Sequence, residues 1–206
     1  ISKDLIPILL HDNTLERTAK KKWLPHDHYY NDIKKLDAGY HFYKETTKIY
    51  IPTLEEVLLF CNKKKINLNI ELKPNKGFEK ENIKSIIKVL SNMNFINHYY
   101  FSSFHWNSLI MMKEIFPNAN YGLLVDSFKN NATLSDIKMI SKKYDFFCCG
   151  FNNKILNSEI IREMLANSIV VNAYSVKNMS ISSSQELWNK GVKSIFIDDP
   201  TKFNLI

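Results

Sequence analysis

The alternation of apolar runs with amphipathic helical stretches is the feature that most constrains the fold of this chain. From Ile51 onward, strand-like runs alternate about six times with stretches whose apolar residues recur at helical spacing. This rhythm is typical of parallel β/α architecture, because parallel strands need long crossover connections. An open doubly wound sheet and a closed barrel both fit it. No strand is followed by the Gly-rich turn of a dinucleotide site or a P-loop.

The local patterns give approximate boundaries for each element. Strands are expected at residues 5–10, 67–73, 99–104, 121–125, 146–151, 169–176 and 194–197. Helical patterns cover residues 79–93, 106–115, 134–140, 160–165 and 185–189. A further helix is expected after Thr53, which stands in capping-box relation to Glu56. Thr133 is a candidate N-cap, and Gly191 a candidate C-cap.

Polar side chains stand at the carboxyl ends of the expected strands. They are His11, Glu71, Lys73, Ser102, Ser103, Asp126, Asn152, Tyr174 and Asp198. In β/α barrels the chemistry sits where the strands end, so one rim would collect all of these groups. A barrel explains this convergence better than an open sheet. We therefore expect an α/β fold of the TIM-type (β/α) barrel class.

The strand at residues 67–73 carries the strongest candidates for a functional site. Three aliphatic residues alternate there with four polar ones, Asn67, Asn69, Glu71 and Lys73. An edge strand with one solvated face would show the same alternation. Inside a sheet covered by helices, however, a carboxylate and an ammonium on one inward face are costly to desolvate. A metal ion and an anionic ligand would neutralise Glu71 and Lys73, which makes them the best site candidates.

Composition narrows the class of protein and its partners. The chain of 206 residues can bury one sizeable core, so a single domain over 1–206 is expected. The 28 Lys and Arg against 21 Asp and Glu leave a formal charge of +7. Nucleic acid or a membrane surface could explain that charge. The lysines are scattered, however, and the runs Lys20–Lys22 and Lys63–Lys65 are typical of solvated faces, so no nucleic-acid partner is expected.

The cysteines and the apolar runs indicate neither a disulfide scaffold nor a membrane protein. Cys61, Cys148 and Cys149 have no metal-binding or disulfide spacing, and we expect all three in the core. No apolar run reaches transmembrane length, so no stable membrane insertion is expected. These features indicate neither a compartment nor an oligomeric state.

Residues 13–52 lack strong periodicity and are rich in aromatic and polar groups. We interpret them as a long, partly ordered excursion over the active-site end of the fold, since loops of this length are usually functional.

Several motifs, taken in order, resemble those of one enzyme family. Residues 11–18, His-Asp-Asn-Thr-Leu-Glu-Arg-Thr, resemble the HD-x-x-L-x-R-T-T signature of the glycerophosphodiester phosphodiesterase family. Residues 51–57 resemble its IPTLEEVL segment, and residues 69–73 its NIEIK strand. Residues 102–104, 174–176 and 191–200 resemble its SSF, WTVN and GVDGIITDxP segments. The resemblance spans the whole chain.

The resemblance implies a barrel that hydrolyses a glycerophosphodiester to glycerol 3-phosphate and an alcohol. In this family two histidines act as general acid and base, and a divalent cation, Mg²⁺ or Ca²⁺, binds the phosphate. His11 matches the second histidine, Glu71 a metal-ligand carboxylate and Lys73 the lysine that faces the phosphate. Tyr174 stands where the family usually has a pocket-lining tryptophan. A small phosphodiester is the implied substrate.

The chain also departs from the family pattern. The family's first strand carries an HRG motif with the other histidine, and the next strand carries an E-x-D pair of metal ligands; neither is present. Residues 1–4 correspond to the turn after E-x-D. We expect the natural protein to be longer rather than a truncated, inactive form, because a barrel without its first strands would expose sheet edges. Ser175 replaces a threonine of the family.

Two rival functions stay open at this point. One is a related barrel that acts on lysophospholipids or inositol phospholipids, a choice that the excursion at 13–52 would decide. The other is a non-catalytic barrel that binds phosphorylated ligands or a protein partner.

Some of the motif residues also have ordinary structural explanations. Asp12 could orient its loop, and Arg17 is expected to be an ion-pair partner rather than a phosphate ligand. Ser102 and Ser103 could cap the following helix, Tyr174 could be core, and Asp198 could accept from backbone amides near Pro200. The remaining histidines, His26, His28, His41, His98 and His105, are expected to be structural or exposed.

Overall fold

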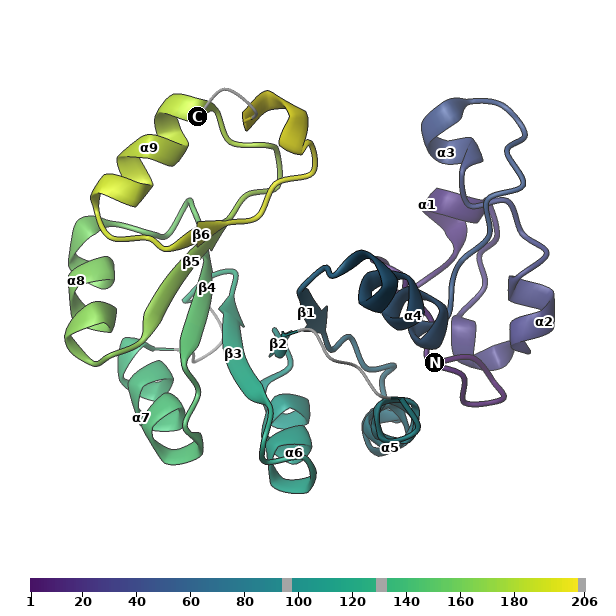
Figure 1. Cartoon of the computed structure of the whole chain (residues 1–206), viewed down its shortest axis with the longest axis horizontal. Coiled ribbons are helices and arrows are strands. Elements are labelled where there is room, and N and C mark those ends of the chain that lie inside the picture. The colour runs from purple at the N-terminus through teal and green to yellow at the C-terminus, as the bar shows by residue number, and fades with distance from the viewer. Residues whose placement is uncertain (94–97, 129–132, 204–206) are drawn as a thin grey trace. The chain divides into compact units, whose positions relative to one another are not determined.

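The computed structural model describes residues 1–93, 98–128 and 133–203. Its contacts divide the chain into two compact units, each treated by itself below. The first comprises Ile1–Leu68 and Lys73–Tyr99, and the second Asn69–Leu72 and Tyr100–Ile206. Figure 1 labels the α-helices and strands of both units.

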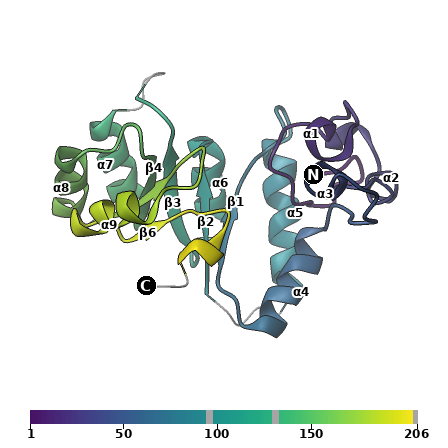
Figure 2. The ribbon, with the colours of Figure 1, turned by 90° about the horizontal axis from the view of Figure 1, so that it is seen from above.

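The first unit is helical. Its short elements are α1 (Glu16–Ala19), η1 (Pro25–Asp27), α2 (Tyr30–Ile33) and α3 (Tyr40–Tyr43). Its two long helices are α4 (Leu54–Lys64) and α5 (Glu79–Ser91), which pack against each other. Figure 2 shows these two helices side by side.

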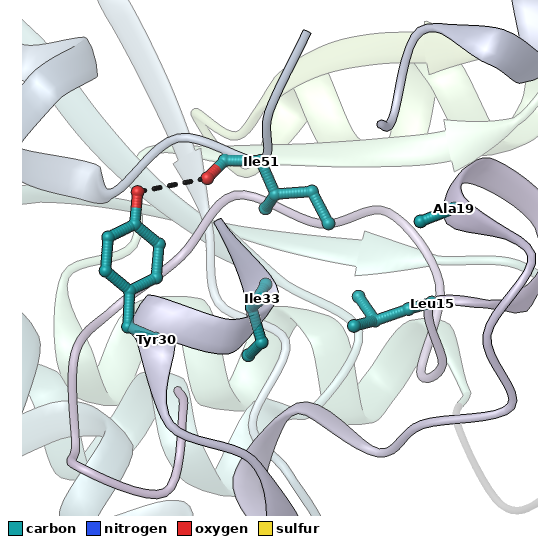
Figure 3. Close-up of a cluster of buried hydrophobic side chains, with 5 residues drawn as sticks. All are labelled: Leu15, Ala19, Tyr30, Ile33 and Ile51. Atoms are coloured by element: carbon teal, nitrogen blue, oxygen red, sulfur yellow. Dashed lines mark hydrogen bonds between the residues drawn. The ribbon is translucent and has the colours of Figure 1, made fainter. Parts of the chain in front are cut away.

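The short helices surround a small hydrophobic core of their own. Leu15, Ala19, Tyr30, Ile33 and Ile51 are buried together, and the Tyr30 hydroxyl donates to the Ile51 carbonyl at 3.2 Å (Figure 3). The sequence predicted this region only as a partly ordered excursion. Helices of four residues are too short to show a helical period, which explains why they were missed. Whether the segment covers an active site stays a prediction.

The start of α4 confirms the predicted capping box. The Thr53 hydroxyl accepts from the Glu56 backbone N–H at 3.1 Å, and the Glu56 carboxylate accepts from the Thr53 N–H at 2.8 Å. Glu56 also accepts from Lys34 Nζ at 3.0 Å and from the Tyr50 hydroxyl at 3.1 Å. Burial opposes ionisation of Glu56, but these donors outweigh it and lower its pKa to about 2.

The strand predicted at residues 5–10 was wrong. The segment forms only one isolated antiparallel bridge, between Ile8 and Thr53. Pro7 has no N–H to contribute to a ladder, and Leu5 adopts a positive φ of 61°, which is outside the strand region. The Pro7 carbonyl instead accepts from the N–H of Leu54, at the start of α4.

The second unit contains the parallel sheet. Its strands are β1 (Leu68–Glu71, which begins in the first unit), β2 (Tyr99–Ser103), β3 (Asn120–Val125), β4 (Cys148–Asn152), β5 (Val170–Tyr174) and β6 (Ser194–Ile195). They lie in the order β1-β2-β3-β4-β5-β6, and each pair from β2–β3 to β5–β6 is parallel. The Leu72 N–H, just after β1, donates to the Ser102 carbonyl of β2 at 2.7 Å.

Helices connect and cover these strands. They are α6 (Trp106–Ile115), α7 (Leu134–Tyr144), α8 (Ser158–Ala166), α9 (Ile181–Asn189) and the short η2 (Pro200–Phe203). Figure 1 shows α7 and α8 on the outer side of the sheet beside β4 and β5. Helix α9 starts before the predicted 185–189, because the Ser180 hydroxyl caps it by accepting from the Ser183 N–H at 3.1 Å.

The core of the second unit lies between the strands and their helices. Phe101, Tyr121, Leu123, Phe151, Ile161, Met164, Val171 and Ala173 are fully buried. Cys148 and Cys149 on β4 are buried too, as predicted, and so is Cys61 on α4 in the first unit. Gly122 of β3 faces Cys148 so closely that a Cβ there would lie 2.3 Å from the Cys148 sulfur.

Within the three described segments, no helix combines the length and the apolarity needed to cross a bilayer.

Candidate active site

In the first unit, His11, Asp12 and Arg17 form a hydrogen-bonded chain. Asp12 Oδ1 lies 2.8 Å from His11 Nδ1. Arg17 donates two hydrogen bonds to the same carboxylate, from Nε to Oδ2 at 2.6 Å and from Nη2 to Oδ1 at 2.9 Å. Arg17 is therefore the ion-pair partner that the sequence predicted. Asp12 therefore orients the imidazole of His11.

The charge on Asp12 fixes which nitrogen of His11 carries a proton. The Arg17 hydrogen bonds, joined by that from His11, lower the Asp12 pKa to about 2. An ionised carboxylate can only accept, so His11 Nδ1 must be the donor. The imidazole is 79% exposed, so Nε2 can meet a ligand from solvent. A histidine held in this way is suited to proton transfer at Nε2.

Lys73 lies in the same unit as His11. Its ammonium donates to the His11 main-chain carbonyl at 3.0 Å. His11 follows the apolar run 5–10, and Lys73 lies two residues after β1. The structure thus brings together two of the four predicted site residues through a main-chain contact.

The other two predicted site residues lie in the second unit, at the carboxyl ends of strands. Glu71 is the last residue of β1, and Tyr174 is the last residue of β5. The negative charge of Glu71 contributes to the raised pKa of Tyr174, so the two groups interact. The first cause of that rise is burial, followed by the hydrogen bond and charge of Asp126. Tyr174 is half-buried, which fits a rim position rather than a core position.

Asp126 and Asn152 complete this rim. Asp126 follows β3 directly, and its Oδ1 accepts from the Tyr174 hydroxyl at 2.9 Å and from Asn152 Nδ2 at 2.8 Å. The ring of Phe104, just after β2, meets the Tyr174 ring edge-on at 5.6 Å. The sequence marks Asp126 and Asn152 as strand ends without indicating a role for them. It marks Phe104 only as part of the SSF motif.

Other strand-end residues have structural partners. Ser103 Oγ donates to the Leu72 carbonyl at 2.7 Å and accepts from the His105 N–H at 2.9 Å, while Ser102 Oγ donates to Asn69 Oδ1 at 2.8 Å. The N-cap of α6 is His105, whose Nδ1 accepts from the Ser108 N–H, rather than either serine. The hydroxyl and N–H of Thr201 donate to Asp199 rather than to Asp198, and the N–H of Asp198 donates to Asn178 Oδ1 at 2.7 Å.

A metal centre needs several ligating side chains close together. Across residues 1–93, 98–128 and 133–203, no three His, Cys, Asp or Glu side chains gather in a way that could hold a metal ion. Glu71 is a hard oxygen donor of the type that Mg²⁺ and Ca²⁺ prefer. Magnesium commonly binds through one or two carboxylates, with water and substrate phosphate completing its coordination. The Glu71 carboxylate is therefore suited to be one ligand of such a cation.

Comparison with known proteins places this geometry in a family. The model of the glycerophosphoryl diester phosphodiesterase family matches residues 1–202. A glycerophosphodiester phosphodiesterase of Bacillus subtilis is 31% identical over 100% of this chain and 73% of its own length. One of Bacillus altitudinis is 27% identical over 98% of this chain and 81% of its own length.

Solved structures agree with these sequence relatives. A phosphodiesterase from Oleispira antarctica, in complex with the product sn-glycerol-3-phosphate, has a TM-score of 0.89 and 26% identity over 100% of this chain and 81% of that one. This similarity confirms the α/β fold of the TIM-barrel class. Since the family model covers nearly the whole chain and the named relatives carry this activity, the protein belongs to the glycerophosphoryl diester phosphodiesterase family and is an enzyme that hydrolyses phosphoric diesters.

Proposed function

We propose that this enzyme hydrolyses glycerophosphodiesters to glycerol 3-phosphate and an alcohol, with His11 as general acid and a divalent cation, Mg²⁺ or Ca²⁺, at Glu71. The observation that carries the proposal is the anchored imidazole. Asp12 engages His11 Nδ1 at 2.8 Å and leaves Nε2 to exchange a proton. In its doubly protonated form, His11 gives the Nε2 proton to the leaving oxygen as the phosphorus–oxygen bond to the alcohol breaks and the oxygen of water bonds to phosphorus.

Lys73 and Glu71 carry opposite charges and have different proposed roles, Lys73 toward the phosphate and Glu71 toward the cation. The Lys73 ammonium is the proposed phosphate ligand, and its bond to the His11 carbonyl fixes the direction of its side chain. Glu71 would hold the cation, which neutralises phosphate charge and lets a nucleophile approach. An ammonium has three donors, so Lys73 can hold the His11 carbonyl and a phosphate oxygen together.

Tyr174 is the proposed substrate-binding residue of the rim. Its hydroxyl is held by Asp126, and its ring meets Phe104. Because burial, Asp126 and Glu71 all raise its pKa, the phenol stays protonated at neutral pH. Tyr174 therefore contributes a neutral ring surface to the site and is not a base.

The test is hydrolysis of glycerophosphocholine, with glycerol 3-phosphate measured as product, in added Mg²⁺ or Ca²⁺ and in EDTA. We expect EDTA to abolish turnover and His11→Ala to lower kcat by about 10²- to 10⁴-fold, the usual contribution of a general acid. Glu71→Gln keeps the size of the side chain but removes its charge, so it should weaken activation by the cation.

Two matched variants serve as controls. His41→Ala removes an exposed histidine of α3, and Glu114→Gln neutralises an exposed carboxylate of α6. Neither should change turnover by more than about twofold, as expected for exposed side chains that have no part in the proposed chemistry. Wild-type rates in EDTA, or a His11→Ala variant as active as His41→Ala, would contradict the proposed chemistry.

A further inference from the structure

Three neighbouring strands end in side chains that meet at one carboxylate oxygen. Asp126 Oδ1 accepts from Asn152 Nδ2 at 2.8 Å and from the Tyr174 hydroxyl at 2.9 Å. Asn152 and Tyr174 are paired in register as the last residues of β4 and β5. Asp126, directly after β3, therefore reaches a residue of β5 although β4 lies between them.

The Tyr174 ring is held at more than one point. Besides Asp126, its hydroxyl lies 3.2 Å from the Val125 main-chain carbonyl. Its ring stands nearly perpendicular to that of Phe104, with an interplanar angle of 85°. Rotation of the ring about its side-chain bonds would break the hydroxyl contacts and the aromatic contact together.

The charge states of Asp126 and Tyr174 favour the hydrogen bond between them. Hydrogen bonds from Asn152 and then Tyr174, with the positive charge of Lys154, keep the Asp126 pKa below its usual value. Asp126 is thus an ionised acceptor at neutral pH, and Tyr174 is a protonated donor. A hydrogen bond from a neutral donor to a charged acceptor is among the stronger kinds.

We infer that Asp126 is a positioning residue, which acts on the substrate only by holding the Tyr174 ring on the rim that also carries Glu71. The inference rests on the proposed function, in which Tyr174 contacts the substrate. The side chain that replaces the family's usual tryptophan brings a hydroxyl with it, and Asp126 is the group that engages this hydroxyl.

The kinetic test compares Asp126→Ala, Asp126→Asn and Tyr174→Phe with the double variant Asp126→Ala/Tyr174→Phe. Asp126→Ala should raise KM for glycerophosphocholine about tenfold, the effect of losing a hydrogen bond to a charged group, with kcat changed less than about threefold. Asp126→Asn keeps an acceptor oxygen and should restore KM to within about threefold of wild type. In the Tyr174→Phe background, Asp126→Ala should add less than about twofold.

A spectroscopic test follows the ring itself. In protein labelled with ¹³C-tyrosine, the Tyr174 resonance is the one that Tyr174→Phe removes. It should move in Asp126→Ala and stay near its wild-type position in Asp126→Asn and in the control Glu114→Ala, which removes an exposed carboxylate of α6. Circular dichroism confirms that each variant is folded. If Asp126→Ala is not, Asp126→Ser replaces it, since its hydroxyl is too short to reach Tyr174.

The two tests separate the possible failures. If wild-type protein hydrolyses no glycerophosphodiester, the proposed function fails, and the NMR comparison alone decides the role of Asp126. An unmoved Tyr174 resonance in a folded variant without the carboxylate overturns the inference. If Asp126→Ala lowers kcat and leaves KM unchanged, the inference is overturned as well. It is also overturned if Asp126→Ala raises KM as much in the Tyr174→Phe background as in the wild type.

Discussion

At the scale of single residues, the ion pair between Asp12 and Arg17 controls the state of His11. The pKa of Asp12 is about 2, below its ordinary 3.8, and the hydrogen bonds of Arg17 are the main cause. A carboxylate with a lowered pKa contributes stability above its ordinary pKa and loses that contribution as the pH falls toward the lowered value. The Asp12 contribution is therefore complete above about pH 4 and disappears toward pH 2.

Arg17→Leu should return the Asp12 pKa toward its ordinary value, because both guanidinium bonds are lost. NMR titration of the Asp12 side-chain carboxyl carbon measures this shift. Arg162→Leu is the matched control, since within the described part of the chain Arg162 donates only to a main-chain carbonyl of its own helix, that of Ser158. An Asp12 pKa that stays near 2 in Arg17→Leu would show that another group sustains it.

Residue-scale contacts were predictable only when they were local in sequence. Asp12 and Arg17 are separated by 5 positions within one motif, and the sequence predicted an ion-pair role for Arg17 without naming its partner. Asp126 and Tyr174 are separated by 48 positions, and their contact depends on how β3, β4 and β5 align. Strand register is set by packing across the sheet, so the sequence placed these groups on one rim but did not pair them.

At the scale of elements, two helices begin with the same capping arrangement. Thr53 caps α4 with Glu56, and Thr133 caps α7 with Asp136. Thr53→Ala and Thr133→Ala should each lower the free energy of unfolding by about 1 kcal/mol. Urea denaturation followed by circular dichroism measures the loss. Thr46→Ala, at an exposed residue outside these helices, is the control, and an equal loss there would argue against a capping effect.

Two glycines of the chain are needed for different reasons. Gly122→Ala would place a Cβ 2.3 Å from the Cys148 sulfur inside the sheet. Gly77 has open space around it but a φ of +83°, which penalises any side chain.

We expect Gly122→Ala to lower the free energy of unfolding by about 1–3 kcal/mol, as overpacking does, and Gly77→Ala by about 1 kcal/mol. The same urea denaturation measures both. In the variant Gly122→Ala/Cys148→Ala the smaller side chain removes the clash, so the Gly122→Ala penalty should shrink in that background. An undiminished penalty would place its origin elsewhere.

The elements themselves were largely predictable, and their boundaries less so. Long amphipathic helices such as α5 follow from periodicity, and α4 from its capping box. The run at residues 5–10 has strand-like composition, but Pro7 and the positive φ of Leu5 prevent a ladder. The serine-rich start of α9 carries no apolar stripe, so its first turn was missed.

At the scale of the whole molecule, the three cysteines report on unfolding. Cys61, Cys148 and Cys149 are buried, and burial raises the pKa of each thiol, that of Cys148 to about 12. Native protein should therefore alkylate at these positions at least about 10³-fold more slowly than unfolded protein. Iodoacetamide labelling with and without urea, read by mass spectrometry, tests this. Rapid native labelling of Cys149 would contradict the burial of β4.

The fold class was predictable because the β/α rhythm runs along the chain, and the solved relative from Oleispira antarctica confirms it. A single domain over 1–206 stays a prediction, since the described contacts divide into two compact units. Which residues far apart in the sequence come into contact depends on three-dimensional packing, and a pattern of residue types does not specify that packing.

Strand order has a consequence for how the polypeptide acquires its shape. Each strand of the sheet neighbours the one made immediately before it. During synthesis, a newly emerged strand and its helix can dock onto a neighbour that has already left the ribosome, with no need to await the final segment. Growth by successive addition keeps loop-closure costs low at every step, despite the parallel arrangement.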